Sequence, residues 1–266
     1  MIPLIRRDRN LRGEVLETEG NYLMVRFNHL QPPFDRPEMR RALLRAVNQE
    51  DFTAAVGGGE AEFQRPGTGF FPPGMADATE AGLDTIRPHY TDAQAREALK
   101  AAGYRGERIV QVSPADYPNV RVANEVLADL LKRIGINLEY VSIDWSSMTQ
   151  RVIRKDAPEA GGFHIHMLNV PCLSVASPLV NSRTRGTGSD ESGWYTSERC
   201  EQLRGEWLLA PDGPERQALA DALQREMLSS VPLVPCGVTL QPAAWRADLE
   251  GVLHGVPKFW NVRRRG

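Results

Sequence analysis

Apolar positions follow two different periods along the middle of the chain, and the change of period predicts alternating helices and strands. Between residues 118 and 134, apolar side chains fall at positions 123, 126, 127, 130, 131 and 134, which is the spacing of one helical face. Segments rich in strand-forming residues flank this helix at 108–112 and 137–141. A strand–helix–strand unit of this length predicts an α/β fold with a parallel or mixed sheet and helices on its faces.

The same patterns extend over most of the chain. Two capping boxes, Asp35 with Glu38 and Thr91 with Gln94, mark predicted helix starts. Residues 57–90 are dense in Gly and Pro and contain no convincing long element, and a loop of that length is usually functional or close to a ligand. The remaining expected helices are 50–56, 145–155, 197–209 and 214–229, and the remaining strands are 21–30, 163–168 and 233–238.

Composition and charge exclude several classes of protein. The 266 residues include 32 basic and 34 acidic side chains, so a net charge of −2 provides no global attraction for nucleic acid or an anionic membrane. No apolar run approaches the roughly 20 residues that span a bilayer. The start, Met1 to Arg7, has no signal-peptide pattern, which indicates a cytoplasmic protein or a longer precursor whose beginning is missing. Three cysteines without a CxxC motif leave the compartment open.

Candidate chemistry is sparse. His164 and His166 stand two apart on a predicted strand and could supply two metal ligands, although the pattern favours two polar residues on one partly buried face, because no third ligand is within sequence reach. No GxSxG, HExxH, Walker A or GxGxxG motif occurs, which disfavours an enzyme. Trp194 and Tyr195 precede a predicted helix and could line a small-molecule pocket or simply pack against that helix.

Six segments in one order resemble bacterial extracellular solute-binding proteins of family 5, which bind dipeptides, oligopeptides or nickel. The first, FNHLQPPFD, is similar to the family's FN…PPFxD crossing, and AREALKAAGY is similar to its AkxLLxeAGY helix. Each motif is weak alone, but their common order and spacing are specific. The six segments are 27–35, 39–50, 95–104, 128–136, 211–235 and 241–252.

The resemblance implies a lobe of the type II periplasmic-binding-protein fold, a mixed sheet flanked by helices. Family members have two lobes and about twice this length, so the chain corresponds to the C-terminal part. Residues 31–240 would form the ligand-binding lobe, residues 1–30 a remnant of the N-terminal lobe with the crossing strand, and residues 241–266 the return segment. A periplasmic location follows, with the signal peptide and N-terminal lobe outside this chain.

The implied function is capture of a peptide or peptide-like solute for the permease of an ABC importer, without a cofactor or metal. The cleft contacts expected from loop positions are Asn169, Cys172, Trp194 and Tyr195, together with Asp144 and Trp145. Leu173 stands about where peptide-binding members carry the Asp that pairs with the ligand's ammonium group. Self-association through exposed surface is also expected. A protein-interaction module and a hydrolase-like enzyme remain alternatives.

Overall fold

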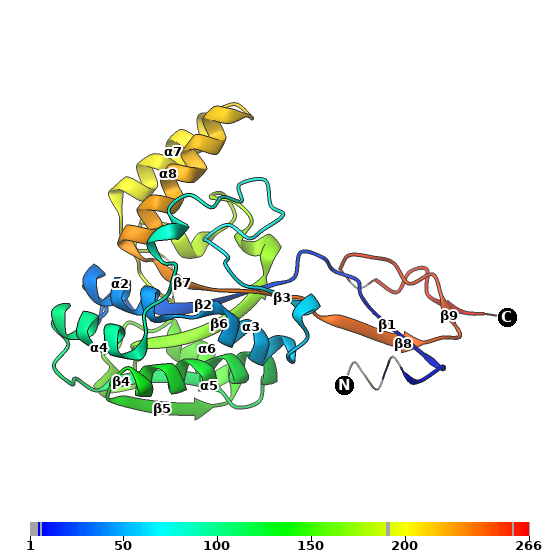
Figure 1. Ribbon diagram of the computed structural model, residues 1–266, viewed down its shortest axis with the longest axis horizontal. Coiled ribbons are helices and arrows are strands. Elements are labelled where there is room, and N and C mark those ends of the chain that lie inside the picture. Colours follow the sequence, from blue (N-terminus) through cyan, green and yellow to red (C-terminus); the bar gives the residue numbers. More distant parts are fainter. Residues whose placement is uncertain (1–4, 6, 190–191, 257, 266) are drawn as a thin grey trace.

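The computed structural model describes residues 5, 7–189, 192–256 and 258–265. Its centre is a six-stranded mixed sheet with the order β3-β7-β2-β6-β4-β5 (Figure 1). β2 runs antiparallel to both β6 and β7, whereas β4 is parallel to β5 and β6. The expected α/β class with a mixed sheet is therefore confirmed. The strands are β2 (Asn21–Phe27), β3 (Gln64–Arg65), β4 (Ile109–Pro114), β5 (Leu138–Ile143), β6 (Ile165–Pro171) and β7 (Leu233–Thr239).

The two faces of the sheet are covered by different helices, because successive side chains of a strand point to opposite faces. On one face, Gln111 of β4 donates a hydrogen bond to the side chain of Asn124 in α5 (Pro118–Arg133) at 3.2 Å. On the other face, Val110 and Val112 pack with Met148 of α6 (Trp145–Val152). The sheet is thus a buried middle layer, as the apolar composition of its strands requires.

Helix boundaries agree closely with the sequence patterns, with one exception at a cap. Thr91 and Gln94 form both hydrogen bonds of the predicted capping box at the start of α4. The predicted box of Asp35 and Glu38 is wrong, since the N-cap is Arg36, which makes no side-chain cap bond, and Pro37 supplies the first helical residue. The other helices are α2 (Pro37–Ala46), α3 (Gln49–Gly57), α4 (Asp92–Ala101), α7 (Glu198–Leu209) and α8 (Pro214–Ser230).

The long segment between α3 and α4 is anchored to the core by two glutamines. The Gln49 side chain bonds Thr68 through both its amide nitrogen and its oxygen. Gln224 of α8 accepts a hydrogen bond from the Phe70 N–H and donates to the carbonyls of Thr79 and Ala81. The segment is therefore a packed part of the domain. Short 3-10 turns are η1 (Ala61–Phe63), η2 (Leu83–Thr85), η3 (Pro158–Ala160), η4 (Cys172–Val175) and η5 (Ser182–Thr184).

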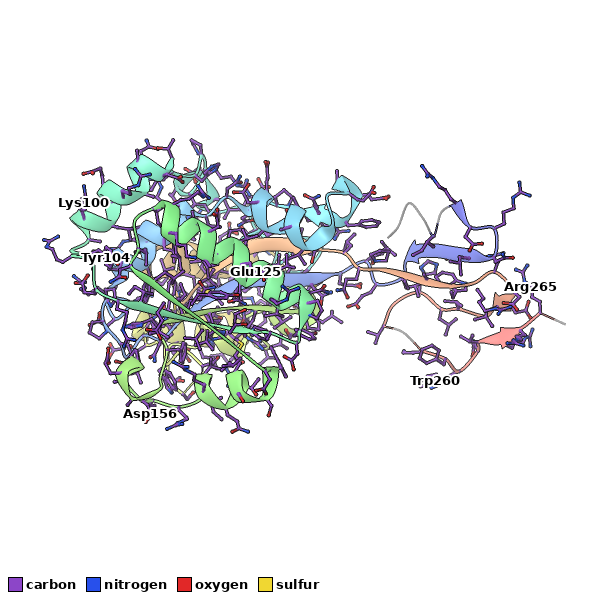
Figure 2. All side chains as sticks on the ribbon, turned by 90° about the horizontal axis from the view of Figure 1, so that it is seen from below. Lys100, Tyr104, Glu125, Asp156, Trp260 and Arg265 are labelled. Carbon is purple, nitrogen blue, oxygen red and sulfur yellow. The ribbon has the colours of Figure 1, made fainter. Side chains whose placement is uncertain are left out.

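The two ends of the chain form an arm that projects from the sheet domain (Figures 1 and 2). β1 (Leu11–Val15) pairs antiparallel with β8 (Pro242–Arg246), and β9 (Leu249–Glu250) pairs with β10 (Arg263–Arg264). The sequence patterns predicted none of these strands. We refer to the described residues of 5–19 and 241–265 as the arm and to residues 20–240 as the lobe.

We propose that the lobe begins at about residue 20, whereas the sequence analysis placed its start at residue 31. β2 is hydrogen-bonded on both sides within the sheet, so it belongs to the lobe itself. The crossing between arm and lobe lies at Gly20, where a Cβ would meet the Thr239 carbonyl oxygen at 2.7 Å. Only glycine allows the entering and leaving chains to pass this closely, and its φ of +79° is also unfavourable for other residues. Pro32-Pro33, which was expected to mark the crossing, follows the opposite end of β2.

Candidate functional site

One edge of the sheet faces the arm, and the directions of the strands bring five strand ends together there. β2 begins at this edge and its neighbour β7 ends there, with Asn21 opposite Thr239. β6 also ends there, with Pro171 opposite Asn21, and the parallel strands β4 and β5 end beside it. Ligands of open α/β sheets bind outside the carboxyl ends of strands. We call this region the arm-facing edge.

Two exposed aromatic rings lie together at the arm-facing edge, where α5 and α6 begin. The rings of Tyr117 and Trp145 are tilted at 39° with centroids 5.1 Å apart. Both follow the ends of parallel strands, Tyr117 after β4 and Trp145 after β5. Their exposed fractions, 48% and 37%, are unusual for aromatic side chains in contact with each other. The pair is a flat apolar surface that a ligand can cover.

Two carboxylates fix the start of α6 beside this pair. Asp116 Oδ1 accepts a hydrogen bond from the backbone N–H of Trp145 at 2.8 Å, and Asp144 Oδ1 accepts one from the backbone N–H of Ser147 at 2.9 Å. The hydrogen bonds from Ser147 hold the pKa of the Asp144 carboxyl below its usual value. Asp144 is thus the N-cap that the helix requires, and it remains a charged group at the exposed edge.

The next two predicted residues lie at the end of β6, with different degrees of burial. Asn169 is half-buried opposite Leu23 of β2, and its Oδ1 has no hydrogen-bond partner among the described residues. Cys172 is fully buried, and burial raises the pKa of its thiol to about 12. The Cys172 side chain is therefore a packing group, whereas Asn169 Oδ1 is a buried acceptor without a partner in the described part of the chain. Leu173, the residue directly after Cys172, is 51% exposed.

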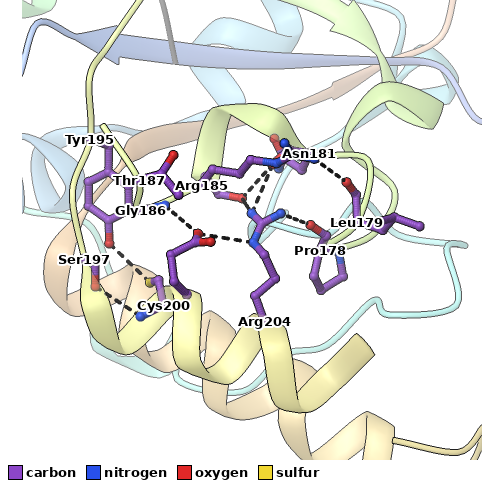
Figure 3. A network of polar contacts seen from close by, with 12 residues as sticks. Pro178, Leu179, Asn181, Arg185, Gly186, Thr187, Tyr195, Ser197, Cys200 and Arg204 are labelled. Atoms are coloured by element: carbon purple, nitrogen blue, oxygen red, sulfur yellow. Dashed lines mark hydrogen bonds and ion pairs between the residues drawn. The ribbon is translucent and has the colours of Figure 1, made fainter. Parts of the chain in front are cut away.

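Trp194 and Tyr195 lie at the opposite end of the sheet from the arm-facing edge. The His29 N–H, beyond the end of β2, donates to the Gly193 carbonyl at 2.9 Å. Trp194 is buried against Phe163, which precedes β6. The Tyr195 hydroxyl contacts the Cys200 thiol at 3.2 Å (Figure 3). Both rings are core groups without an exposed face, so they do not join the site that was expected to contain them.

A polar network holds the segment that carries these two aromatic residues (Figure 3). Glu201 Oε1 accepts from the Gly186 N–H at 2.7 Å and forms an ion pair with Arg204 at 3.4 Å. Arg204 also donates to the carbonyls of Pro178 and Asn181. Because Arg204 is 8% exposed, its charge needs these partners. The aromatic pair at 194–195 is thus positioned for packing by helix α7.

The histidine pair does not form a metal site. His164 Nδ1 accepts a hydrogen bond from the Val110 N–H at 2.9 Å, so the ring nitrogen is occupied and unprotonated. Burial lowers the pKa of His164 to about 4 and that of His166 to about 3. Among the described residues, no group of three His, Cys, Asp or Glu side chains could hold a metal ion.

Tyr117 and Asp116 are the site residues that the sequence patterns did not indicate. The segment between β4 and α5 reads Ala-Asp-Tyr-Pro, which looks like an ordinary strand-to-helix connection. The available signal was its position, because loops after neighbouring parallel strands share one edge. Asp144 and Trp145 were placed by that reasoning, and Asp116 and Tyr117 occupy the equivalent place one strand earlier.

The comparisons with known proteins agree on one family. Residues 2–169 match the model of the bacterial extracellular solute-binding proteins, family 5 Middle. The chain belongs to this family. A family relative from Sinorhizobium fredii, the probable peptide ABC transporter periplasmic-binding protein y4tO, is 31% identical over 266 residues, which are 99% of this chain and 50% of that protein. The glutathione-binding protein GsiB of Escherichia coli K12 is 25% identical over 236 residues, 85% of this chain and 44% of its own length.

Solved structures show the same fold. The periplasmic binding protein DppA from Helicobacter pylori, in complex with the peptide STSA, superposes with a TM-score of 0.78 at 19% identity, covering 100% of this chain and 51% of that one. This family-5 chain therefore spans about half the length of the relatives it matches. No helix in the described part of the chain is long and apolar enough to cross a membrane.

Proposed function

We propose that this chain is the ligand-binding lobe of the substrate-binding component of an ABC importer. The whole protein would capture a peptide or peptide-like small solute in the periplasm and deliver it to the membrane permease. Membership of the family-5 solute-binding proteins supports this role, and the matching relatives carry names of binding proteins for peptides and glutathione.

One observation carries the proposal. The strand ends at which the chain passes between lobe and arm lie at the same edge as the exposed ring pair of Tyr117 and Trp145. A ligand held at this edge is next to the only two chain connections that the described residues make between lobe and arm. Rotation about these connections would close a second lobe over the ligand and exclude water.

The side chains at the edge suggest how a peptide would be held. The ring pair can stack on an apolar or aromatic side chain, and such contacts contribute about 1 kcal/mol each. Asn169 Oδ1 is buried without a hydrogen-bond partner among the described residues, and a turn of this half-buried side chain toward the edge would let it accept a hydrogen bond from a peptide N–H. Leu173, exposed where peptide-binding members carry an acid, favours an apolar group at that point of the ligand.

The test uses the two-lobed, full-length protein and the ligand that co-purifies with it, identified by native mass spectrometry. Replacing Trp145 by Ala is expected to weaken binding by about 1 kcal/mol or more, roughly fivefold or greater, because it removes half of the exposed ring pair. Trp194→Phe is the matched control, since that ring is buried at the opposite end of the lobe. Calorimetry should show an unchanged Kd for the control. An unchanged Kd for Trp145→Ala would exclude the ring pair from the binding site.

The chain by itself is expected to bind this ligand barely or not at all, because one lobe provides only part of the enclosing surface. Micromolar binding measured by calorimetry would contradict this expectation. We also propose that the isolated chain self-associates through its arm, where Phe259 and Trp260 are more than three-quarters exposed, at 80% and 84%. Sedimentation at high concentration should detect dimers, and Trp260→Ser should reduce them. A monomer at all concentrations would disprove this.

A further inference from the structure

A pocket lies on the side of the lobe away from the arm, between the ends of two helices and the loop that covers them. It has a volume of about 680 Å³, in the range of small-molecule sites. Helix α2 and the C-terminal part of α8 form two walls, and the loop around η2 forms the third. The residues that line the pocket include three arginines and three aliphatic residues, namely Arg41, Arg45, Arg225, Leu44, Ile86 and Leu228.

The loop that closes the pocket is fixed closely onto α8. Gly82 has a φ of +77°, which favours glycine, and a Cβ there would lie 2.9 Å from Leu228 Cδ1 and 3.3 Å from Arg225 Cγ, so the loop packs closely on α8. Just before it, the carbonyl of Ala81 accepts a hydrogen bond from the Gln224 side chain at 3.0 Å. The pocket wall is therefore held in place by the same buried glutamine that anchors the long segment. Leu44, Ile86 and Leu228 give the pocket an apolar lining.

The charged groups around this lining are mostly positive. Three arginines and one acid, Asp84, line the pocket. Arg41 is occupied by an ion pair with Glu38 and a hydrogen bond to the Ser229 carbonyl. Arg45 lies over the Tyr90 ring at 4.2 Å, and its buried Nε has no acceptor among the described residues. Arg225 is exposed and has no ion-pair or hydrogen-bond partner in the described part of the chain.

We propose that this pocket binds a soluble amphiphilic anion, a medium-chain carboxylate. The carboxylate would accept hydrogen bonds from the guanidinium groups of Arg225 and Arg45, which have unused donors. The acyl chain would cover Leu44, Ile86 and Leu228, whose burial contributes favourable free energy in proportion to the apolar area. A neutral amphiphile would leave the arginine donors without an acceptor, and a cationic one would meet like charges.

The site is separate from the arm-facing edge, so it does not depend on the transport role. It also differs in chemistry, because the edge presents acids and aromatic rings, whereas this pocket presents arginines around aliphatic side chains. A single acyl chain suits a pocket closed on three sides, while a helical or extended peptide segment needs an open groove.

The experiment is calorimetric titration of this chain with decanoate and decyltrimethylammonium below their critical micelle concentrations, with decanol below its solubility limit, and with inorganic phosphate. Decanoate is expected to bind, decanol at least tenfold more weakly, and the other two not measurably. The variants are Arg225→Glu, which reverses an exposed charge at the pocket, and Arg199→Glu, which reverses the charge of an exposed residue of α7 that does not line the pocket. Arg225→Glu should weaken decanoate binding at least tenfold, and Arg199→Glu should leave it unchanged.

Several results would overturn the proposal. Equal affinity for decanoate and decanol would show an apolar pocket without anion recognition. Equal loss in both variants would show a general charge effect, and unchanged binding in Arg225→Glu would place the anion elsewhere. Co-sedimentation with vesicles of phosphatidylglycerol that depends on Arg225, without decanoate binding, would assign the pocket to a lipid surface. Circular dichroism of both variants confirms that each is folded.

Discussion

The lobe and the arm of this chain contain strands of similar length in very different surroundings. In β2 of the lobe, six of seven residues are buried, whereas in β1 of the arm the three central residues are exposed. Most aromatic side chains of the lobe are buried, although Tyr117 and Trp145 at the arm-facing edge are exposed, while Phe259 and Trp260 of the arm are 80% and 84% exposed. Hydrogen bonding alone therefore does not explain stability in this molecule. The lobe has a hydrophobic core, whereas the arm has hydrogen-bonded strand pairs without such a core.

The difference shows which part of the chain can fold as an independent unit. A two-stranded sheet is at best marginally stable in water, since it buries little apolar surface. The arm's strands must therefore gain their stability from attachment to the lobe at Gly20 and Leu240, or from surface supplied by another chain or segment. Relatives that are about twice as long contain more sequence from which such surface could come.

The largest expected difference between the two regions is in the free energy of unfolding after one side chain of each region is truncated to Ala. Met24→Ala in β2 removes a fully buried side chain and is expected to lower the free energy of unfolding by about 2–5 kcal/mol. Trp260→Ala removes a larger group from the arm, yet it should change this free energy by less than about 0.5 kcal/mol. Urea unfolding followed by circular dichroism measures both. Similar losses would mean that the arm shares the lobe's core.

A second pair compares two arginines. Arg40 is 4% exposed and donates four hydrogen bonds, to the carbonyls of Phe34, Asp35, Ser230 and Val231. Arg40→Met leaves these carbonyls unsatisfied near the end of α8, and we expect a loss of about 3 kcal/mol or more. Arg246→Met removes an exposed ion pair with Asp248 in the arm and should leave the urea midpoint unchanged. A stable Arg40→Met variant would show that water replaces the guanidinium.

Arg40 also illustrates what the sequence could not predict. Patterns with a local cause were predicted well, including the capping box of Thr91 with Gln94 and the apolar stripe of α5. The end of α8 has no such local signal. It stops at Val231, in a left-handed conformation with φ of 51°, and its last carbonyls are satisfied by Arg40 from another helix. Contacts between residues 190 positions apart leave no trace in a local pattern.

The residues predicted for the candidate site also separate into those placed by a local sequence pattern and those whose position depends on distant contacts. Asp144 and Trp145 follow a recognisable strand, so the rule for strand ends placed them at the arm-facing edge. Trp194 and Tyr195 were chosen because aromatic residues in a loop can line a pocket, but a loop can approach either end of a sheet. Only the hydrogen bond from His29 to Gly193 and the packing on Phe163 reveal which end it is. The arm strands were missed because their exposed residues give no hydrophobic period.

The pH dependence of stability tests the comparison without changing the arm, because the histidines with lowered pKa values all lie in the lobe. Burial lowers the pKa of His29 to about 3, that of His164 to about 4 and that of His166 to about 3. In the unfolded chain each ring binds a proton below its ordinary pKa of about 6.5, while the folded lobe keeps it neutral. Protonation therefore favours the unfolded state as the pH falls from about 6.5 toward the folded values. Each histidine can contribute a slope of up to about 1.4 kcal/mol per pH unit.

Urea unfolding between pH 7 and pH 5 should accordingly show a steady loss of stability that steepens toward pH 5. His166→Gln removes one of the three titrating rings, so the slope should fall by about a third, whatever the variant's stability at pH 7. Reading the slope separates the titration from the packing that the substitution also disturbs. An unchanged slope would mean that the His166 ring is protonated in the folded lobe. The core of the lobe would then contain a further buried positive charge, and a buried carboxylate would have to accompany it.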